Sequence, residues 1–257
     1  MSVARLRLAA VVVTHGAAPE LEECLAALAP QVEELVVVAN LPGPKPSLPA
    51  GARLVENEHP VGFAANANRG VAETSAPFVV VANPDAIAEA GTVETLRAFA
   101  AERPRAGVVG PELRYPDGRW QPSRRRFPTV SGTLVRRTPL RYLFRPFERQ
   151  RDHYLLDERT AEPVPADWML GAFLLYRRSM LDELGGFDEG FRLYGEDIDL
   201  CYRAAKGGWE RWYVPAAVVR HEYPAVIDRR FLTRRTLWHW RGIIRFVRKH
   251  PERLRAL

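Results

Sequence analysis

Four short apolar runs in the first hundred residues have the pattern of buried strands. Residues 8–13 form a continuous aliphatic stretch, as expected for a strand that is covered on both faces. The other three runs span residues 35–39, 53–56 and 78–82. Residues 41–51 hold four prolines and two glycines and are predicted to form a loop.

Helical patterns separate these strands. After Pro19, apolar side chains recur at the spacing of one helix face, at Leu21, Cys24, Leu25 and Leu28. A second helix is predicted over residues 63–72. Strands that alternate with helices predict right-handed βαβ units and a parallel sheet, whose ligands bind at the carboxyl ends of the strands. The first half of the chain is therefore a candidate nucleotide-binding unit.

The second half has a different pattern. Residues 114–151 are rich in arginine and proline and predict a long loop. Later patterns predict, in order, a strand at 169–176, a helix at 179–184, a helix from near Glu196 to 207–208, and a short strand at 212–214. No linker cleanly divides the chain into two domains.

Residues 223–257 form a basic, amphipathic C-terminal extension. Its apolar helical stripe consists of Leu237, Trp240, Ile244 and Val247. Arg241, Arg245 and Arg248 lie on a different face of the same helix. Two interpretations fit this pattern: the helix lies on an anionic membrane surface, or it packs on the preceding domain with a solvated basic face.

Composition narrows the classes of protein. The 257 residues are 47% hydrophobic, as in a packed globular chain, and no apolar run approaches the roughly 18 residues of a membrane span. Because a signal-peptide pattern is also absent, we expect a cytoplasmic protein. Cys24 and Cys201 have no metal-ligand spacing and are expected to be reduced.

Charge is distributed unevenly along the chain. Residues 1–100 carry a net charge of −5 and residues 101–257 a net charge of +11. A basic chain suggests nucleic-acid binding, but no helix-turn-helix, zinc-finger or RNP pattern is present, and the acidic first half repels phosphate backbones. A dinucleotide-dependent oxidoreductase is disfavoured because no Gly-x-Gly-x-x-Gly motif follows the first strand.

Two groups of polar side chains are candidates for chemistry. Asn83-Pro84-Asp85 follows the fourth strand, where it either binds a hard divalent cation or forms an ordinary turn. Five carboxylates gather between residues 188 and 199. Glu196, at the start of a predicted helix, is explained equally by complementing the helix dipole and by general-base catalysis.

Four segments resemble glycosyltransferase family 2 and, within it, the rhamnosyltransferase-like branch. They are residues 57–70, 83–85, 168–178 and 185–209. They occur in the family's order and spacing, and the resemblance covers residues 8–222. It implies a GT-A fold, an α/β structure with a Rossmann-like, mostly parallel sheet flanked by helices. It further implies a single domain, 1–222, with a nucleotide-sugar-binding half, 1–100, and an acceptor half, 101–222.

The resemblance also implies catalytic and metal-binding roles. Asp197 corresponds to the general base that takes the proton from the acceptor hydroxyl, and Glu196 orients the acceptor. Asp85 and His221 correspond to ligands of a Mg²⁺ or Mn²⁺ ion on the diphosphate. Without the resemblance, His221 is better interpreted as a structural histidine. Asn83 departs from the family's Asp-x-Asp motif, and an amide binds cations more weakly than a carboxylate does.

Substrate contacts are implied in the same way. The donor-binding residues are Thr14, His15, Asn40, Asn66, Arg69, Asn83 and Asp85. Ala39-Asn40 stands where the family commonly has Asp-Asn, which removes one base contact. The acceptor-binding residues are Trp168, Gly171 and Glu196. Asp167 and Trp209 could line the acceptor cleft together with Trp168. The competing interpretation is that the tryptophans belong to the core, as buried tryptophans more often do.

The resemblance implies an inverting, metal-dependent hexosyltransferase. A sugar, by resemblance rhamnose, passes from a dTDP- or UDP-sugar to a hydroxyl of a glycan or polyprenyl-linked acceptor in cell-envelope or polysaccharide synthesis. The enzyme is expected in the cytoplasm or peripherally on the inner face of the plasma membrane, without a nucleic-acid partner. The alternative is a non-catalytic basic protein that binds membranes or nucleic acid.

Overall fold

The computed structural model describes residues 6–16, 19–127, 158–222 and 234–254. Every strand and helix predicted for the first half is present. The elements there are β1 (Leu8–Thr14), α1 (Pro19–Leu28), η1 (Ala29–Gln31), β2 (Glu34–Ala39), β3 (Arg53–Glu56), α2 (Phe63–Ala72), β4 (Phe78–Ala82), β5 (Ala86–Ala88) and α3 (Thr92–Ala101). The last two elements were not predicted.

The second half supplies the remaining strands and three more helices in the described residues. They are β6 (Ala106–Arg114), β7 (Trp120–Gln121), β8 (Arg124–Arg125), β9 (Val164–Pro165), β10 (Trp168–Met169), β11 (Phe173–Arg177), α7 (Arg178–Leu184), α8 (Glu196–Lys206), β12 (Glu210–His221), α10 (Arg234–Lys249) and η3 (Pro251–Leu254). The predicted loop at 114–151 contains the short strands β7 and β8, and its residues 128–157 lie outside the described residues.

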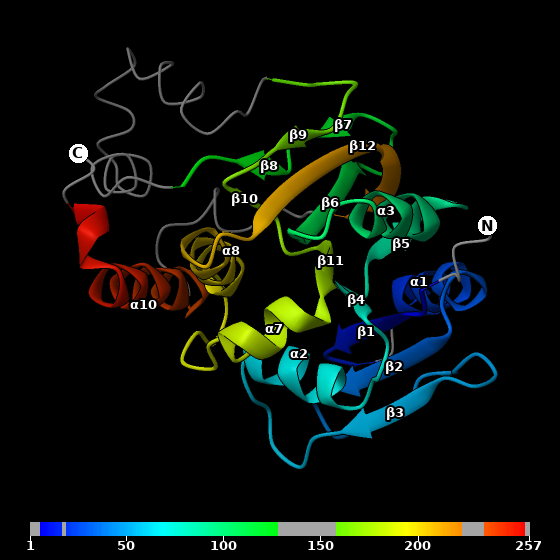
Figure 1. Cartoon of the computed structure of the whole chain (residues 1–257). Helices are drawn as coiled ribbons and strands as arrows, with labels where there is room; N and C mark the ends of the chain where they lie inside the picture. Colours follow the sequence, from blue (N-terminus) through cyan, green and yellow to red (C-terminus); the bar gives the residue numbers. More distant parts are fainter. Residues whose placement is uncertain (1–5, 17–18, 128–157, 223–233, 255–257) are drawn as a thin grey trace.

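One mixed sheet joins the two halves, with the strand order β3-β2-β1-β4-β11-β6-β12-β5 (Figure 1). The strands β1 to β4 are parallel, and β12 is parallel to β6. Strand β11 lies between β4 and β6 and is antiparallel to both. The reversed strand β11 therefore joins the parallel block β1 to β4 to the parallel pair β6 and β12, and the short strands β5, β7 and β9 add antiparallel pairs to β12 or β6.

Helices cover both faces of this sheet, which explains the continuous aliphatic runs. Alternate strand residues such as Ala10 and Val12 share a core with the apolar faces of α1 and α3. Their neighbours Val11 and Val13 share a second core with α2, α7 and α8. Figure 1 shows the two groups of helices on opposite sides of the sheet. Both cysteines are free thiols buried in these cores, as predicted.

The predicted strand at 169–176 is wrong as a single element. Trp168–Met169 pair with β8 in a separate two-stranded sheet, and only Phe173–Arg177 enter the main sheet. A turn at Gly171 and Ala172 separates the two pieces. Both pieces are buried, so the apolar run gave no sign of the break. The predicted strand at 212–214 is part of the longer β12, which an irregularity between Val214 and Val218 interrupts.

The C-terminal helix packs on the domain, as one of the two interpretations of its sequence predicted, but its basic face is not wholly solvated, because Arg245 pairs with Asp188 of the domain. Lys249 Nζ lies 3.0 Å from Asp199 Oδ2 of α8, and the Phe246 side chain is buried. In Figure 1 this helix, α10, lies beside α8. No helix within the described residues is both long enough and apolar enough to cross a membrane.

Candidate active site

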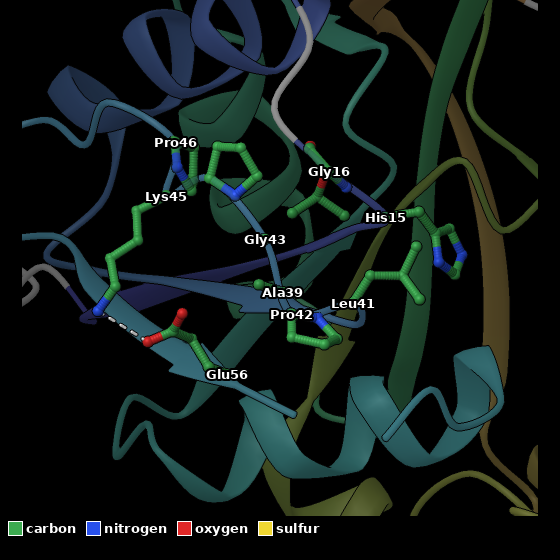
Figure 2. Close-up of a pocket in the computed structure, with 11 residues that line it drawn as sticks. His15, Gly16, Ala39, Leu41, Pro42, Gly43, Lys45, Pro46 and Glu56 are labelled. Carbon is green, nitrogen blue, oxygen red and sulfur yellow. Dashed lines mark hydrogen bonds and ion pairs between the residues drawn. The ribbon is translucent and has the colours of Figure 1, made fainter. Parts of the chain in front are cut away.

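A hollow of about 130 Å³ lies at the carboxyl ends of β1 and β2. Figure 2 shows His15 and Gly16 at the end of β1, facing the proline-rich loop that follows β2. Lys45 Nζ and Glu56 Oε2, 2.9 Å apart, tie this loop to the end of β3. Proline fixes its own backbone φ, so the prolines at 42, 44 and 46 make one wall of the hollow rigid.

His15, a predicted donor-binding residue, lines this hollow and contacts Asn40, another predicted donor-binding residue, which lies buried behind it. Asn40 Nδ2 lies 3.0 Å from His15 Nδ1, while Asn40 Oδ1 accepts hydrogen bonds from Asn57 Nδ2 and from the Val61 N–H. Because Asn40 Oδ1 is already an acceptor, Nδ2 donates to His15 and leaves the imidazole proton on Nε2. The buried Thr14 hydroxyl instead bonds the backbone of Gly16, with its donated bond 2.6 Å long.

Four polar side chains form a network behind the hollow. Asn57 Nδ2 donates to Asn40 Oδ1 at 3.0 Å and to Asn66 Oδ1 at 2.6 Å. Asn57 Oδ1 accepts a hydrogen bond from Arg69 Nη1. Asn40 is 2% exposed and Asn66 is 0% exposed, so the structure does not bring either amide to the surface of the hollow. Only Arg69 is exposed, and the network fixes the position of its guanidinium.

The central residue of this network, Asn57, was not among the predicted site residues. Its signal in the sequence was a second asparagine directly after a strand, in line with Asn40 after the preceding strand. Parallel strands end at the same sheet edge, and Ala39 is in register with Glu56. The two asparagines that follow these residues therefore lie side by side.

Replacing Asn57 with alanine is expected to lower the free energy of unfolding by about 1–3 kcal/mol, because the buried amide oxygens of Asn66 and Asn40 each lose a hydrogen-bond donor. Chemical denaturation of the two proteins measures the difference. The matched control is Glu58→Ala at the next, exposed position, which is expected to stay within about 0.5 kcal/mol of the parent. Equal stability of the parent and Asn57→Ala would contradict this account of the network.

Asp85 and His221 come together because β5, which begins directly after Asp85, pairs with β12, which ends at His221. Asp85 follows β4, His221 is the last residue of β12, and Asp85 Oδ1 lies 3.7 Å from His221 Nε2. His221 Nδ1 lies 3.0 Å from Gln121 Oε1, an acceptor, so Nδ1 carries the proton and Nε2 faces Asp85. Burial lowers the pKa of His221 to about 4 and raises that of Asp85 to about 6, with Glu20 adding to the latter shift.

This pair fits a divalent cation that takes its other ligands from a diphosphate. A distance of 3.7 Å is too long for a hydrogen bond, and a carboxylate oxygen and a neutral imidazole nitrogen are ordinary Mn²⁺ ligands. In the part of the chain that the structure describes, no three His, Cys, Asp or Glu side chains gather as a metal site. The protein alone therefore supplies two ligands, and Asn83 adds no carboxylate.

Glu196 and Asp197 open helix α8. Asp197 Oδ2 accepts a hydrogen bond from the Gly171 N–H at 3.2 Å, and Asp197 Oδ1 accepts one from the Ile198 N–H at 2.8 Å. Burial raises the pKa of Asp197 and, together with the charge of Asp197, that of Glu196. Among the described residues, the buried Glu196 Oε2 has no hydrogen-bond partner. Asp197 is thus the member of the pair whose side-chain oxygens accept hydrogen bonds from backbone N–H groups.

Two of the remaining carboxylates pair with the C-terminal helix. Asp199 is 0% exposed and accepts from Arg203 Nε at 2.7 Å, and His250 Nε2 lies 2.9 Å from it. Burial alone would raise the pKa of Asp188, but hydrogen bonds from Arg245 and Lys249 hold that pKa well below its ordinary value. These two side chains bind cations of the protein itself, and the exposed Glu189 accepts a hydrogen bond from Asn68 Nδ2 at 2.9 Å. Of the five carboxylates, Asp197 and Glu196 are therefore the two without a side-chain partner among the described residues.

The turn at Gly171 and Ala172 connects the two chemical groups. The Asn83 N–H donates to Ala172 O at 2.8 Å, and the neighbouring Gly171 N–H donates to Asp197. A Cβ atom at Gly171 would lie 3.3 Å from Asp197 Cβ, so glycine allows this close approach. The backbone of Asn83 after β4 and the predicted base on α8 therefore flank one turn.

The tryptophans support the packing interpretation. Trp168 is 9% exposed, and its indole N–H donates to Arg126 O at 2.8 Å. Asp167 Oδ2 accepts a hydrogen bond from the Phe127 N–H, and Trp209 is buried among core residues. None of the three side chains lines the hollow at β1 and β2.

An α/β sheet with these groups at its strand ends defines a glycosyltransferase of the GT-A class. A sequence profile described as glycosyltransferase like family 2 matches residues 46–239. The chain is 34% identical over 240 residues to N-acetylglucosaminyl-diphospho-decaprenol L-rhamnosyltransferase of Mycobacterium tuberculosis, covering 82% of this chain and 74% of that one. Rhamnosyltransferase WbbL of Escherichia coli is 38% identical over 81 residues, covering 32% of this chain and 30% of WbbL. The chain belongs to glycosyltransferase family 2, as the sequence motifs predicted.

Solved structures confirm the predicted fold. GalNAc-T7, solved with UDP, GalNAc and Mn²⁺, superposes with a TM-score of 0.64 at 15% identity, covering 86% of this chain and 45% of that chain. The mannosyltransferase PcManGT from Pyrobaculum calidifontis, in complex with GDP-Man and Mn²⁺, gives 0.57 at 18% identity, covering 97% of this chain and 65% of that chain. This chain thus spans less than two thirds of either solved protein, and the likeness concerns the fold.

Proposed function

We propose that this protein is an inverting rhamnosyltransferase that moves rhamnose from a dTDP- or UDP-sugar to a hydroxyl group of a polyprenyl-linked glycan in cell-envelope or polysaccharide synthesis. The observation that carries the proposal is the 34% identity over 240 residues with an enzyme named for a diphospho-decaprenol-linked acceptor. The Asp85–His221 pair and the Asp197 carboxylate beside the turn at Gly171 support it.

In this proposal residues 1–100 bind the donor and residues 101–222 bind the acceptor. The hollow beside His15 takes the nucleoside, and Arg69, held by Asn57, faces its phosphates or sugar. Asn40 and Asn66 are buried and do not contact the donor directly; they act through their hydrogen bonds with Asn57, which holds Arg69. Gly171 and Glu196 lie at the acceptor side, where Glu196 orients the hydroxyl that reacts.

Asp197 is the general base of the proposed reaction. It accepts the proton of the acceptor hydroxyl while that oxygen attacks the anomeric carbon from the face opposite the diphosphate. The new C–O bond forms as the bond to the diphosphate oxygen breaks, so the configuration inverts and the nucleoside diphosphate leaves with the electron pair. Backbone N–H donors from Gly171 and Ile198 hold the Asp197 side chain in place.

Asp85 and His221 would hold a Mg²⁺ or Mn²⁺ ion. Such an ion, when bound, neutralises the charge that develops on the leaving diphosphate. The Gln121 side chain fixes the His221 ring so that Nε2 faces the ion, and Asn83 anchors the turn through its backbone. Two protein ligands predict weak binding of the metal alone and tighter binding together with a nucleoside diphosphate.

A panel of nucleotide-sugars with Mn²⁺ tests the donor. A ligand at about 100 times its Kd is expected to stabilise the folded protein by roughly 2.7 kcal/mol, and dTDP-rhamnose is expected to give the largest rise in melting temperature. The same panel without metal is the control. A melt that responds to oligonucleotides and to no nucleotide-sugar would favour the alternative of a nucleic-acid-binding protein.

The outward face of α10 supports a peripheral position at an anionic membrane, on the cytoplasmic side. Leu237 is 51% exposed and Ile244 is 47% exposed. Arg241 and Arg248 lie on the surface beside them and, within the described residues, make no ion pair. Exposed apolar side chains flanked by arginines are the pattern of an interfacial helix. A polyprenyl-linked acceptor would be reached from such a position.

Flotation with anionic liposomes tests this position. The protein is expected to bind at low salt and to be released at high salt, and Arg241→Ala/Arg248→Ala is expected to weaken binding roughly 30-fold, at about 1 kcal/mol per arginine. Point variants suit the test because α10 also packs on the domain, so its removal would expose the core. Arg103→Ala/Arg119→Ala removes the same charge elsewhere and should bind like the parent. Equal flotation of the α10 variant and the control variant would exclude the outward face of α10 as the membrane-binding surface.

A further inference from the structure

The segment between α7 and α8, residues 186–195, ends in an unusual backbone turn just before the predicted base. Tyr194 has φ 71° and Gly195, which begins α8, has φ 101°. A left-handed tyrosine is costly and persists only where its surroundings determine it. Asp197 follows two residues later, so this turn sets the direction in which α8 presents its first carboxylates.

Helix α10 contacts this turn directly. A Cβ atom at Gly242 would lie 2.4 Å from Tyr194 O, closer than real Cβ contacts. Only glycine at 242 lets the helix backbone reach the turn. The ring of His239, one turn earlier on α10, makes an edge contact with the Tyr194 ring, with centroids 5.8 Å apart.

Helix α10 contacts the segment 186–195 at a second point, Asp188. Arg245 Nη2 lies 2.6 Å from Asp188 Oδ1, and Lys249 Nζ lies 2.7 Å from Asp188 Oδ2. Lys249 Nζ also lies 3.0 Å from Asp199 Oδ2 on α8. Lys249 therefore bridges the segment and the first turns of the helix that carries Asp197.

The opposite side of the segment is held by α2, in the donor half. The Phe63 N–H donates to Arg192 O at 2.9 Å, and Asn68 Nδ2 donates to Phe187 O at 2.9 Å. Residues 186–195 thus lie between α2 and α10. The contacts with α2 are made within the predicted domain 1–222, whereas the contacts with α10 depend on the C-terminal extension.

We infer that α10 is part of the catalytic apparatus, with Gly242 and Lys249 as positioning residues that set the orientation of Asp197 through the turn at Tyr194. The inference rests on the proposed role of Asp197 as the base. It goes beyond membrane attachment, because these contacts are on the face of α10 that packs on the domain. Gly242 and Lys249 act on the acceptor step and leave the donor hollow untouched.

The test compares kcat, donor affinity and melting temperature in full-length variants. Gly242→Ala is expected to lower kcat about 10²-fold, the loss typical of a base displaced by about 1 Å, with donor Kd unchanged. Alanine favours helix more than glycine does, so lost helicity cannot explain that result. A folded Gly242→Ala with the kcat of the parent would overturn the inference.

Lys249 provides a second and independent comparison. Lys249→Ala is expected to lower kcat with donor Kd unchanged, and Lys249→Arg to restore it. The matched control is Lys206→Ala, which removes the 2.9 Å ion pair to Glu252 at the far end of α8. Equal kcat losses in Lys249→Ala and Lys206→Ala would show a merely structural role. If Asp197→Asn itself keeps normal turnover, the proposed base is wrong, whereas normal turnover in the α10 variants alone rejects only this inference.

Discussion

Asp197→Asn is expected to lower turnover by ~10²–10⁴-fold, the usual effect of removing a general base. Asparagine keeps the size of aspartate and can still accept the hydrogen bond from the Gly171 N–H, but it cannot take up the acceptor proton. Donor affinity is expected to stay the same, because Asp197 lies at the acceptor side of the turn. Initial rates of sugar transfer, with calorimetric titration of the donor, measure both quantities.

Asp182→Asn is the control for this change, since Asp182 is an exposed carboxylate on the neighbouring helix α7. It is expected to leave turnover unchanged. A correctly folded Asp197→Asn enzyme with near-normal transfer would refute the assignment and direct the search to Glu196. Asp188 and Asp199 are poor alternatives because both bind cations of α10.

Asp85→Ala is expected to lower turnover on the order of 10²-fold or more and, unlike Asp197→Asn, to weaken metal-dependent donor binding as well. The reason is that Asp85 would contact the ion on the diphosphate and not the acceptor. His221→Ala is expected to act in the same direction. The measurement is the Mn²⁺-dependent rise in melting temperature with a nucleoside diphosphate, followed by transfer rates over a range of Mn²⁺ concentrations.

Asp117→Ala removes an exposed carboxylate from the β6–β7 turn and serves as the control. It should keep both the metal response and the rate. Undiminished Mn²⁺-dependent stabilisation in Asp85→Ala would place the ion elsewhere. The two aspartate variants together separate the donor step from the acceptor step.

Strands β1, β2 and β4 were predictable because burial on both faces leaves a run of aliphatic residues that no other element explains. Helix α3 also had a readable signal, with Val93, Leu96 and Ala100 on one face, although it was not predicted. The break at Gly171 could not be predicted from the sequence. The residues on either side of it are buried in β10 and β11, as they would be in one continuous strand.

Contacts between distant segments account for most of what the sequence left open in the site. Motifs identified Asp85, His221 and Asp197 as candidates, but not the turn at Gly171 that brings Asp197 and the end of β4 together. The acidic segment before α8 gave no indication that Asp188 and Asp199 pair with cations some fifty residues later. The distribution of charges along the sequence indicates that carboxylates and cationic side chains can pair, whereas only the fold determines which of them form ion pairs.

The reversed strand β11 has a consequence for how the chain reaches its native state. Both of its sheet neighbours, β4 and β6, precede it in the chain, and β4 is separated from it by a long stretch of sequence. During synthesis from the N-terminus, these two strands emerge with unpaired, strongly apolar edges that must wait for their common partner. Pairings between distant residues form slowly because a large loop must close first. The nascent protein is therefore most exposed to aggregation, and most dependent on chaperones, in the interval before β11 leaves the ribosome.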